Sequence, residues 1–208
     1  MIIVGAGGHA KEVANVLAEA GPVEDVFFYD DVTPNVPSLL LNRFPILRSE
    51  ADARAVLKKD PRFILGVGTP KNRFDLTTKF EAMGGMLTSI ISPGAHVGEF
   101  QVQLGAGLNV MTAAVITGDV TIGRGCLVHI HSSIHHDCAI GEFCELLPGS
   151  RILGHVSIGK FSSIGSGAVI LPRIKIGDRV TVGAGAVVTK DIPDGQTAMG
   201  VPARIVKR

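Results

Sequence analysis

The sequence predicts two consecutive domains, an α/β domain in residues 1–86 and a parallel β-helix in residues 87–208. Three observations support this fold class. Aliphatic residues recur at every sixth position of the second half, the first 86 residues lack this period, and a glycine-rich turn follows the first apolar run. The composition agrees, since 26 Gly, no Trp and 19% charged residues suit tight turns around aliphatic cores and not a helical bundle.

The six-residue period is continuous, because every sixth residue from Leu104 to Val188 is Ile, Leu or Val. A helix repeats every 3.6 residues and a strand every 2, whereas six residues form one side of a triangular β-helix coil. Two earlier hexads begin at Ile91 and Val97. The step of seven residues from Val97 to Leu104 predicts one extra residue in a bulge or turn. The fifth residue of a hexad is often small and is expected to face the interior at the corners, as at Ala114, Cys126, Ser132, Cys138, Ser162, Ala168 and Ala186.

Three hexads make one coil, so residues eighteen apart are expected to stack about 4.8 Å apart. This register places His136 between Gly118 and Gly154, and Asp137 between Asp119 and His155. A histidine between two glycines has open space on both sides.

The first 86 residues alternate between strand and helix patterns. We expect strands at Ile2–Val4, Val26–Tyr29 and Phe63–Gly68, and helices at Glu12–Ala20 and from Pro70 to about Met83. This alternation predicts a small Rossmann-like parallel sheet, with a ligand at the carboxyl ends of its strands.

The turn after the first strand reads Gly-x-Gly-Gly-His and departs from the dinucleotide fingerprint Gly-x-Gly-x-x-Gly, because Ala10 stands at the third glycine. Glycines let backbone N–H groups approach a phosphate, and the following helix directs its positive end at the anion. The candidate nucleotide contacts are Gly7, Gly8, His9 and Lys11, with Asp30 and Asp31 reading the ribose or base. The alternatives are a turn without a ligand, a histidine that only caps or lines it, and a solvated acidic turn.

Composition excludes several classes of partner. Twenty basic residues balance 19 acidic ones, which argues against binding to nucleic acid or to an acidic membrane surface. The apolar run Ile152–Gly159 is too short to cross a membrane, and the first residues lack the features of a signal peptide. Three cysteines are too few for a disulfide framework and favour a cytoplasmic location, with Cys126 and Cys144 stacked as reduced interior thiols.

A zinc site is not predicted, although five potential ligands lie close together in the sequence. The six-residue frame places the histidines in three different phases and puts the cysteine in an interior slot. These potential ligands are His129, His131, His135, His136 and Cys138.

Three stretches together resemble the NeuD-type sugar O-acyltransferases and the bacterial nucleotide-sugar N-acetyltransferases, which are hexapeptide-repeat enzymes with a left-handed β-helix. The stretches are residues 3–11, residues 134–141 with His-His-Asp-Cys-Ala-Ile-Gly, and residues 199–203 with Met-Gly-Val-Pro-Ala. The resemblance covers essentially the whole chain. It implies a left-handed helix, an amino-terminal domain that holds the nucleotide of an activated amino-sugar, and acetyl-CoA in a groove between adjacent subunits of a trimer.

The resemblance also implies the catalytic residues. His136 matches the family's general base, and Asp137 is the adjoining acid where many relatives have Glu. Histidine suits a base near neutral pH, and the acid can orient its ring. The acceptor then attacks the thioester directly, without a nucleophilic residue on the protein.

The expected acetyl-CoA contacts are Gly154, Ser166 and Ala184, with the Gly154 N–H as the candidate oxyanion donor. Two positions depart from relatives. His135 precedes the base where some carry an acid, so it is a second candidate base. Glu145 stands where some carry a second histidine near the thioester.

The leading prediction is a homotrimeric acetyl-CoA-dependent N-acetyltransferase that acts on the amino group of a nucleotide-linked deoxy amino-sugar. The alternatives are O-acetylation of a sugar of the sialic acid type, and a non-catalytic nucleotide-binding β-helix scaffold. UDP, dTDP and GDP are equally compatible with the sequence.

Overall fold

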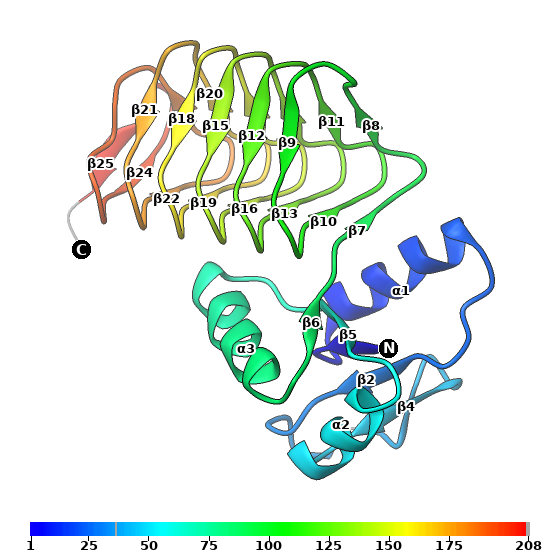
Figure 1. Cartoon of the computed structure of the whole chain (residues 1–208). Helices are drawn as coiled ribbons and strands as arrows, with labels where there is room; N and C mark the ends of the chain where they lie inside the picture. Colours follow the sequence, from blue (N-terminus) through cyan, green and yellow to red (C-terminus); the bar gives the residue numbers. More distant parts are fainter. Residues whose placement is uncertain (36, 207–208) are drawn as a thin grey trace.

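The computed structural model describes residues 1–35 and 37–206, and Figure 1 shows an α/β unit beside a β-helix. The α/β unit contains one six-stranded sheet in the order β3-β4-β2-β1-β5-β6, parallel except for β3. Its strands are β1 (Ile2–Val4), β2 (Phe27–Tyr29), β3 (Leu39–Leu40), β4 (Phe44–Leu47), β5 (Arg62–Leu65) and β6 (Met86–Leu87), and its helices are α1 (Gly8–Ala20), α2 (Glu50–Leu57) and α3 (Pro70–Ala82).

The expected strands and helices are present, and two of their ends are shifted by more than one residue. Helix α1 begins at Gly8 and not at Glu12, because Gly7 already serves as its extended N-cap residue. Strand β5 ends at Leu65 and not at Gly68, because the chain turns through residues 66–69 into α3. Sequence reasoning missed β3, β4, α2 and β6, which are short elements without a long apolar period.

The β-helix consists of three sheets, which we name by position. The domain-facing sheet contains β7 (Ile90–Ile91), β10 (Asn109–Val110), β13 (Leu127–Val128), β16 (Glu145–Leu146), β19 (Ser163–Ile164), β22 (Thr181–Val182), β24 (Thr197–Met199) and β25 (Arg204–Val206). The back sheet contains β8 (His96–Val97), β11 (Val115–Ile116), β14 (Ser133–Ile134), β17 (Arg151–Ile152), β20 (Val169–Ile170) and β23 (Val187–Val188). The front sheet contains β9 (Val102–Leu104), β12 (Val120–Ile122), β15 (Cys138–Ile140), β18 (Ser157–Ile158) and β21 (Lys175–Ile176).

The strand register confirms the eighteen-residue coil. Ile116 pairs with Ile134 and Ile122 with Ile140, and the aliphatic ladder from Val110 to Val188 is buried in one core. Burial of each such side chain stabilises the fold by roughly 1.5–3 kcal/mol. The small residues predicted for the corners are buried as well, and Cys126 and Cys144 are free, stacked thiols.

The extra residue lies in a turn. Ile116 pairs with Val97, nineteen positions earlier, whereas Ile122 pairs with Leu104, eighteen earlier. The insertion therefore falls within residues 98–101, where Gln101 has a φ of 55°.

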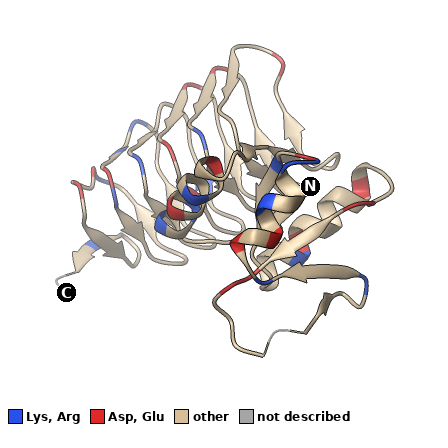
Figure 2. Cartoon of the chain, turned by 60° about the horizontal axis from the view of Figure 1, so that its bottom comes forward, with Lys and Arg blue, Asp and Glu red and all other residues tan. Residues whose placement is uncertain are grey.

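The α/β unit packs against the domain-facing sheet. Met111 and Leu127 of the β-helix share a core with the buried face of α1, which carries Ala10, Val13 and Val16. Figure 2 shows acidic and basic residues interspersed over the helices and the β-helix turns, with no patch of one sign. No helix in the described part of the chain is long and apolar enough to cross a membrane.

Candidate active site

A pocket of about 530 Å³ lies at the carboxyl ends of β1, β2 and β5, the edge at which the sequence predicts a ligand; we call it the βα pocket. Three loops line it, residues 5–9, 29–33 and 66–68, together with part of α3. Of the predicted nucleotide contacts, Gly7, Gly8, His9, Asp30 and Asp31 line this pocket. Lys11 does not, because α1 begins at Gly8 and residue 11 is exposed almost one turn along the helix.

The βα pocket offers backbone amides to an anion. No side chain caps the start of α1, and a Cβ built on Gly7 or Gly8 would meet nothing within 4 Å. The first N–H groups of the helix are therefore open to a ligand. A larger hollow of about 690 Å³ lies at the opposite edge of the sheet, around Met1, Phe27 and Arg62, and lacks such a helix start.

The two acidic residues of the pocket already have partners. Asp30 accepts hydrogen bonds from the backbone N–H groups of Val32 (3.1 Å) and Thr33 (2.8 Å), which fixes the loop after β2. Asp31 accepts from the Tyr29 hydroxyl at 2.8 Å and from Lys79 Nζ at 2.7 Å. Partial burial alone would raise the pKa of Asp31, but the hydrogen bonds from Lys79 and Tyr29 and the charge of Lys79 together outweigh it, and the pKa lies below its ordinary value.

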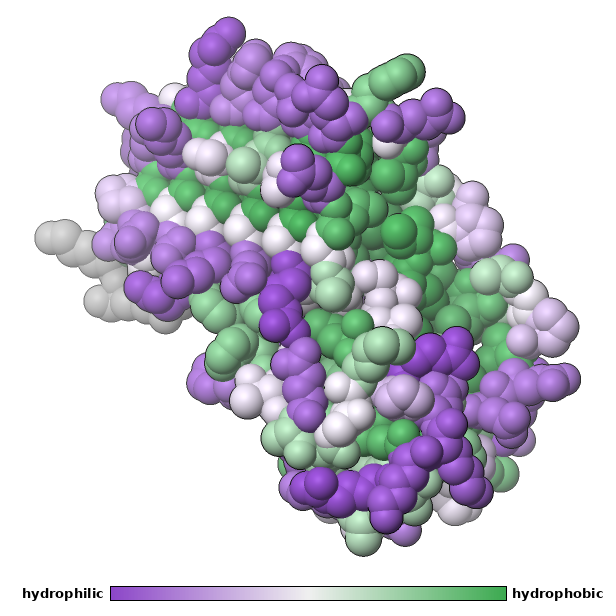
Figure 3. Space-filling model, in the orientation of Figure 1, coloured by the Kyte–Doolittle hydropathy of each residue, from purple (hydrophilic) through white to green (hydrophobic). Residues whose placement is uncertain are grey.

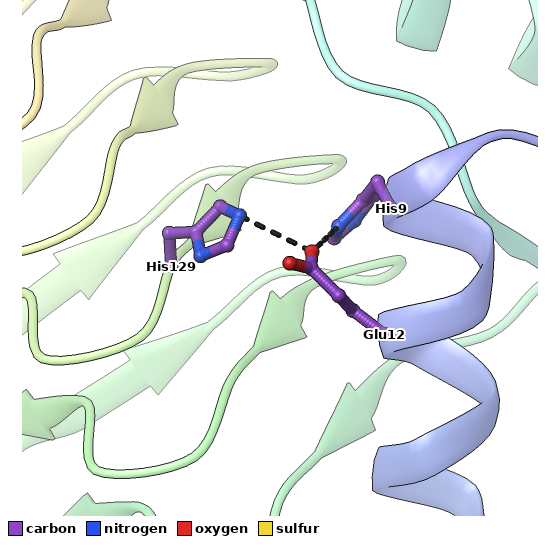
Figure 4. Close-up of side chains that lie close together, drawn as sticks. All are labelled: His9, Glu12 and His129. Atoms are coloured by element: carbon purple, nitrogen blue, oxygen red, sulfur yellow. Dashed lines mark hydrogen bonds and ion pairs between the residues drawn. The ribbon is translucent and has the colours of Figure 1, made fainter.

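His9 lies at the inner end of the pocket and joins a cluster that crosses to the β-helix (Figure 4). Its Nδ1 is 3.0 Å from Glu12 Oε2, and His129 Nε2 of the β-helix is 3.4 Å from the same oxygen. Burial lowers the pKa of His9 from 6.5 to about 4, so this imidazole is neutral at neutral pH.

The predicted base lies elsewhere, on the turns between the back and front sheets, which we call the histidine ridge. His136 Nδ1 is 2.5 Å from Asp137 Oδ2, and His155 Nε2 is 3.7 Å from that oxygen. The hydrogen bond from His136 lowers the pKa of Asp137. An ionised carboxylate only accepts hydrogen bonds, so Nδ1 carries the proton and the lone pair of the neutral ring lies on Nε2.

The stacking predicted for His136 is confirmed. A Cβ built on Gly154 would lie 2.6 Å from His136 Cε1, whereas one built on Gly118 would meet only Phe100 O, at 3.3 Å. The imidazole therefore leans against the glycine of the next coil, and its side chain is 60% exposed. Gly154 is buried beneath this ring, and among the described residues no backbone acceptor is assigned to its N–H.

The predicted acetyl-CoA contacts do not meet within one chain. Gly154 lies on the histidine ridge, whereas Ser166 and Ala184 are exposed on turns between the domain-facing and back sheets, at a different edge of the prism. Glu145 lies on the domain-facing sheet and not on the ridge. Its Oε1 accepts the Thr69 N–H at 3.3 Å, and its Oε2 accepts the Ser163 hydroxyl at 3.1 Å.

The βα pocket and the histidine ridge occupy opposite sides of the β-helix. The α/β unit covers the domain-facing sheet, and the turns between the back and front sheets form the edge farthest from it, at the top of Figure 1. One chain therefore does not bring a ligand of the pocket to His136.

Two buried residues of the interface were not found from the sequence. Arg73 of α3 is fully buried and donates to Gly125 O at 2.7 Å and to Asn109 Oδ1 at 2.9 Å. Burial lowers the pKa of Arg73 to about 10. Neither residue belongs to a local motif, because most of their partners are distant in the sequence; Gly125 lies 52 positions from Arg73, and Leu65 lies 44 positions from Asn109.

Of the five potential zinc ligands, His129 and His136 lie in two different groups of side chains, each close enough together to hold a metal ion. His129 groups with His9 and Glu12, and His136 groups with Asp137 and His155. Cys138 is buried in its interior slot.

Comparisons with known proteins agree with this architecture. Residues 1–80 match the PglD N-terminal domain, and residues 155–190 match the bacterial transferase hexapeptide model of six repeats. The chain is 33% identical to PerB from Caulobacter crescentus, solved with CoA and GDP-perosamine; the match covers 99% of this chain and 96% of PerB, with a TM-score of 0.86.

Two further structures are similar over the whole length. The acetyltransferase domain of PglB from Neisseria gonorrhoeae is 32% identical, with 99% of this chain and 98% of that one covered and a TM-score of 0.86. WeeI from Acinetobacter baumannii is 29% identical, with 99% and 100% covered and a TM-score of 0.88. A comparison with curated proteins found no match. The two family models, in this order along the chain, and the full-length match to PerB show that the chain belongs to the nucleotide-sugar acyltransferase family, whose enzymes join this amino-terminal domain to a left-handed β-helix of hexapeptide repeats.

Proposed function

We propose that this protein transfers the acetyl group of acetyl-CoA to the amino group of a nucleotide-linked deoxy amino-sugar. The observation that carries the proposal is the His136–Asp137 pair, which leaves Nε2 of an exposed imidazole ready to accept a proton. The relatives support the substrate class, since the Caulobacter crescentus enzyme was solved with CoA and GDP-perosamine and the Neisseria gonorrhoeae domain with acetyl coenzyme A.

The reaction needs one proton transfer and one carbonyl substitution. The acceptor amine attacks the thioester carbon and forms the C–N bond, while His136 Nε2 removes the proton from its nitrogen. Asp137 accepts the Nδ1–H and stabilises the imidazolium that results. The C–S bond then breaks, the imidazolium returns the proton to the leaving sulfur, and CoA departs as a thiol. The Gly154 N–H donates to the oxyanion of the tetrahedral intermediate.

We assign the nucleotide to the βα pocket, with residues 1–86 as its binding domain. The open N–H groups at the start of α1 would hold the pyrophosphate beside Gly7 and Gly8. Asp30 and Asp31 would face the ribose or base, because both carboxylates lie where β2 ends in the pocket.

We further propose a homotrimer in which each active site combines two subunits. The pocket and His136 lie on opposite sides of one β-helix, so the sugar can reach only the His136 of a neighbouring copy. In this arrangement Gly154 of one subunit and the partner subunit's Ser166 and Ala184 flank the same acetyl-CoA.

A second surface feature supports this assembly. Figure 3 shows a band of hydrophobic and weakly polar residues along the front of the β-helix, between two hydrophilic edges. Within the front sheet a shallow groove of about 470 Å³ begins at β15, the strand that follows His136 and Asp137; Gly141 and Gly159 line it, with Asp178 and Asp194 also in the lining. An exposed face with such a band suits contact with a second subunit or with the donor. The buried free thiols favour a cytoplasmic site of action.

The composite site is tested by mixing two inactive variants. Gly7→Val blocks backbone approach in the βα pocket and raises the acceptor KM, and His136→Ala removes the base. Random assembly of the two co-expressed variants should recover activity at about a quarter of the sites, measured at low acceptor concentration. Sites built within one chain would recover nothing.

The substrate class is tested by thiol release from acetyl-CoA. Release with nucleotide-linked amino-sugars, and none with free sialic acids, is the expected result. The reverse result would favour O-acetylation, and no release with either class would favour a scaffold.

A further inference from the structure

Two of the three loops that line the βα pocket are held in place by side chains of the β-helix. The first loop is residues 5–9 and the second is residues 66–69. Three residues of the domain-facing sheet or its turns, Asn109, His129 and Glu145, connect to these loops directly or through Glu12.

The orientation of the Asn109 amide is fixed on both sides. Arg73 can only donate, so the amide atom 2.9 Å from its Nη2 is the oxygen, Oδ1. Leu65 O can only accept, so the amide atom 2.7 Å from it is Nδ2. The second N–H of Asn109 then points at His9 Nε2, 3.3 Å away, which accepts. Asn109 thus connects the end of β5, just before the second loop, to the histidine of the first loop.

This orientation fixes the proton positions in the cluster of Figure 4. His9 Nε2 accepts from Asn109, so the proton of the neutral ring lies on Nδ1 and is donated to Glu12. His129 Nδ1 accepts the Ile130 N–H at 2.9 Å, which leaves its N–H on Nε2, 3.4 Å from Glu12 Oε2. Glu12 accepts a hydrogen bond from His9 and lies close to His129, and both ring nitrogens of His9 are committed to the protein.

The same proton positions argue against a metal ion between these three side chains. A metal would need the lone pairs of His9 Nδ1 and His129 Nε2, the two nitrogens that carry protons here. The cluster is therefore a polar contact between the domains.

The second loop rests on Glu145. Glu145 is 8% exposed, and its carboxylate accepts a hydrogen bond from the N–H of Thr69. The backbone of Thr69 has a φ of 51°, a value that is strained for any residue other than glycine. A Cβ built on Gly68 would lie 2.8 Å from Glu145 Oε1, so the loop also approaches this carboxylate closely. Arg73 holds the same loop through Val67 O at 2.9 Å.

We propose that Asn109, His129 and Glu145 are positioning residues for the nucleotide-linked acceptor, so that the β-helix forms the floor of the nucleotide site and sets the spacing of its two loops. This inference rests on the proposed function for the assignment of a nucleotide to the βα pocket. It places His9 in the floor and not among the charged contacts of the pyrophosphate. It also gives Glu145 a role on the acceptor side of the reaction.

The test compares Glu145→Ala and Asn109→Leu with Glu19→Gln. Glu19 is the matched control, because it lies on α1 and accepts hydrogen bonds from Ser92 and Thr112 of the β-helix, but contacts neither loop. Binding of UDP, GDP and dTDP is measured by calorimetry. For the diphosphate that binds the wild type, we expect the Kd to rise at least tenfold in both test variants and less than twofold in the control, with an unchanged KM for acetyl-CoA. Unchanged Kd values in folded test variants would overturn the proposal.

A second measurement does not depend on the nucleotide. Hydrogen exchange of the Thr69 amide should be faster in Glu145→Ala and stay slow in Glu145→Gln, which keeps an acceptor oxygen. An equally slow amide in Glu145→Ala would overturn the role of Glu145. If no diphosphate binds the wild type, the proposed pocket fails, and this exchange still decides whether Glu145 holds the loop.

The proton positions have their own readout. Nitrogen NMR of histidine-labelled protein should show His9 protonated on Nδ1 and His129 on Nε2. Zn²⁺ titration should give the same result for the wild type and for His129→Gln. Zn²⁺ binding that is lost in His129→Gln would overturn the assignment of the proton positions.

Discussion

The βα pocket and the histidine ridge are built in opposite ways. The pocket stands on buried, interlocked contacts between residues distant in sequence, such as Arg73 with Asn109 and Glu145 with Thr69. The ridge consists of exposed turns whose key contacts join adjacent residues or residues eighteen apart. Under the proposed function, the comparison teaches that a buried, interlocked site would serve recognition and a sparse, exposed site would serve chemistry. In the proposed trimer a second subunit completes the ridge, so the chemistry would occur only where assembly brings the two sites together.

The largest effect should come from the ridge. His136→Ala should lower kcat by about 10² or more, with little change in the acceptor KM, because it removes the only general base of the proposed mechanism. The pH profile of kcat/KM should lose its lower limb.

His135→Ala is the matched control and should cost less than tenfold. A severe His135→Ala variant beside a nearly normal His136→Ala variant would contradict the register-based assignment and transfer the role to His135.

Gly154→Ala should be the next most severe change on the ridge. The added Cβ would lie 2.6 Å from His136 Cε1 and force the imidazole away from its position. We expect kcat to fall by about 10 to 10². Gly118→Ala, on the other side of the same histidine, is the control and should stay within about threefold, because its Cβ would meet only Phe100 O at 3.3 Å. Equal kinetics of the two variants would show that the ring is free to move.

Asp137→Asn should lie between His136→Ala and His135→Ala, with a loss in kcat of roughly tenfold or somewhat more. The amide oxygen can still accept the Nδ1–H, but the charge that stabilises the imidazolium is gone. Asp119→Asn, which changes the stacked residue one coil away, is the control. If Asp137→Asn lowered kcat no more than Asp119→Asn does, Asp137 would only orient the ring.

The smallest effect concerns stability at the pocket. The pKa of His9 is lowered from 6.5 to about 4 by burial, so between these values the unfolded chain binds a proton that the folded chain does not. Stability should therefore rise with pH across this window, by up to about 1.4 kcal/mol per pH unit from this group. The wild type should have a higher urea midpoint of unfolding at pH 7 than at pH 5, and His9→Gln should reduce this difference. His96→Gln, at an exposed position, should not change it. An unchanged slope in His9→Gln would contradict the buried neutral ring.

The same comparison explains which features could be predicted from the sequence. The β-helix and the stacking of His136 could be predicted, because a strict period converts positions in the sequence into positions on the surface. The glycine loop and the strand ends located the βα pocket for a similar reason, since parallel strands place their carboxyl ends at one edge. The residues beneath the pocket could not be predicted from the sequence. Asn109 is an outward position like any other in its hexad, and only the docking of α3 decides that Arg73 lies against it. Lys11 was misplaced because the first residue of α1 could not be read from the loop.

The uniform coil also governs how this architecture can change in length. Insertion or deletion of eighteen residues keeps each inward side chain inward and each corner at a corner, whereas another number moves the following sequence onto the wrong faces unless a turn absorbs it, as the turn within residues 98–101 absorbs one residue. Beyond the ridge the β-helix can therefore grow or shrink only in steps of one coil, about 4.8 Å each. A groove along its side can be fitted to donors of different length in these steps, while the catalytic turn and the docked α/β unit stay as they are.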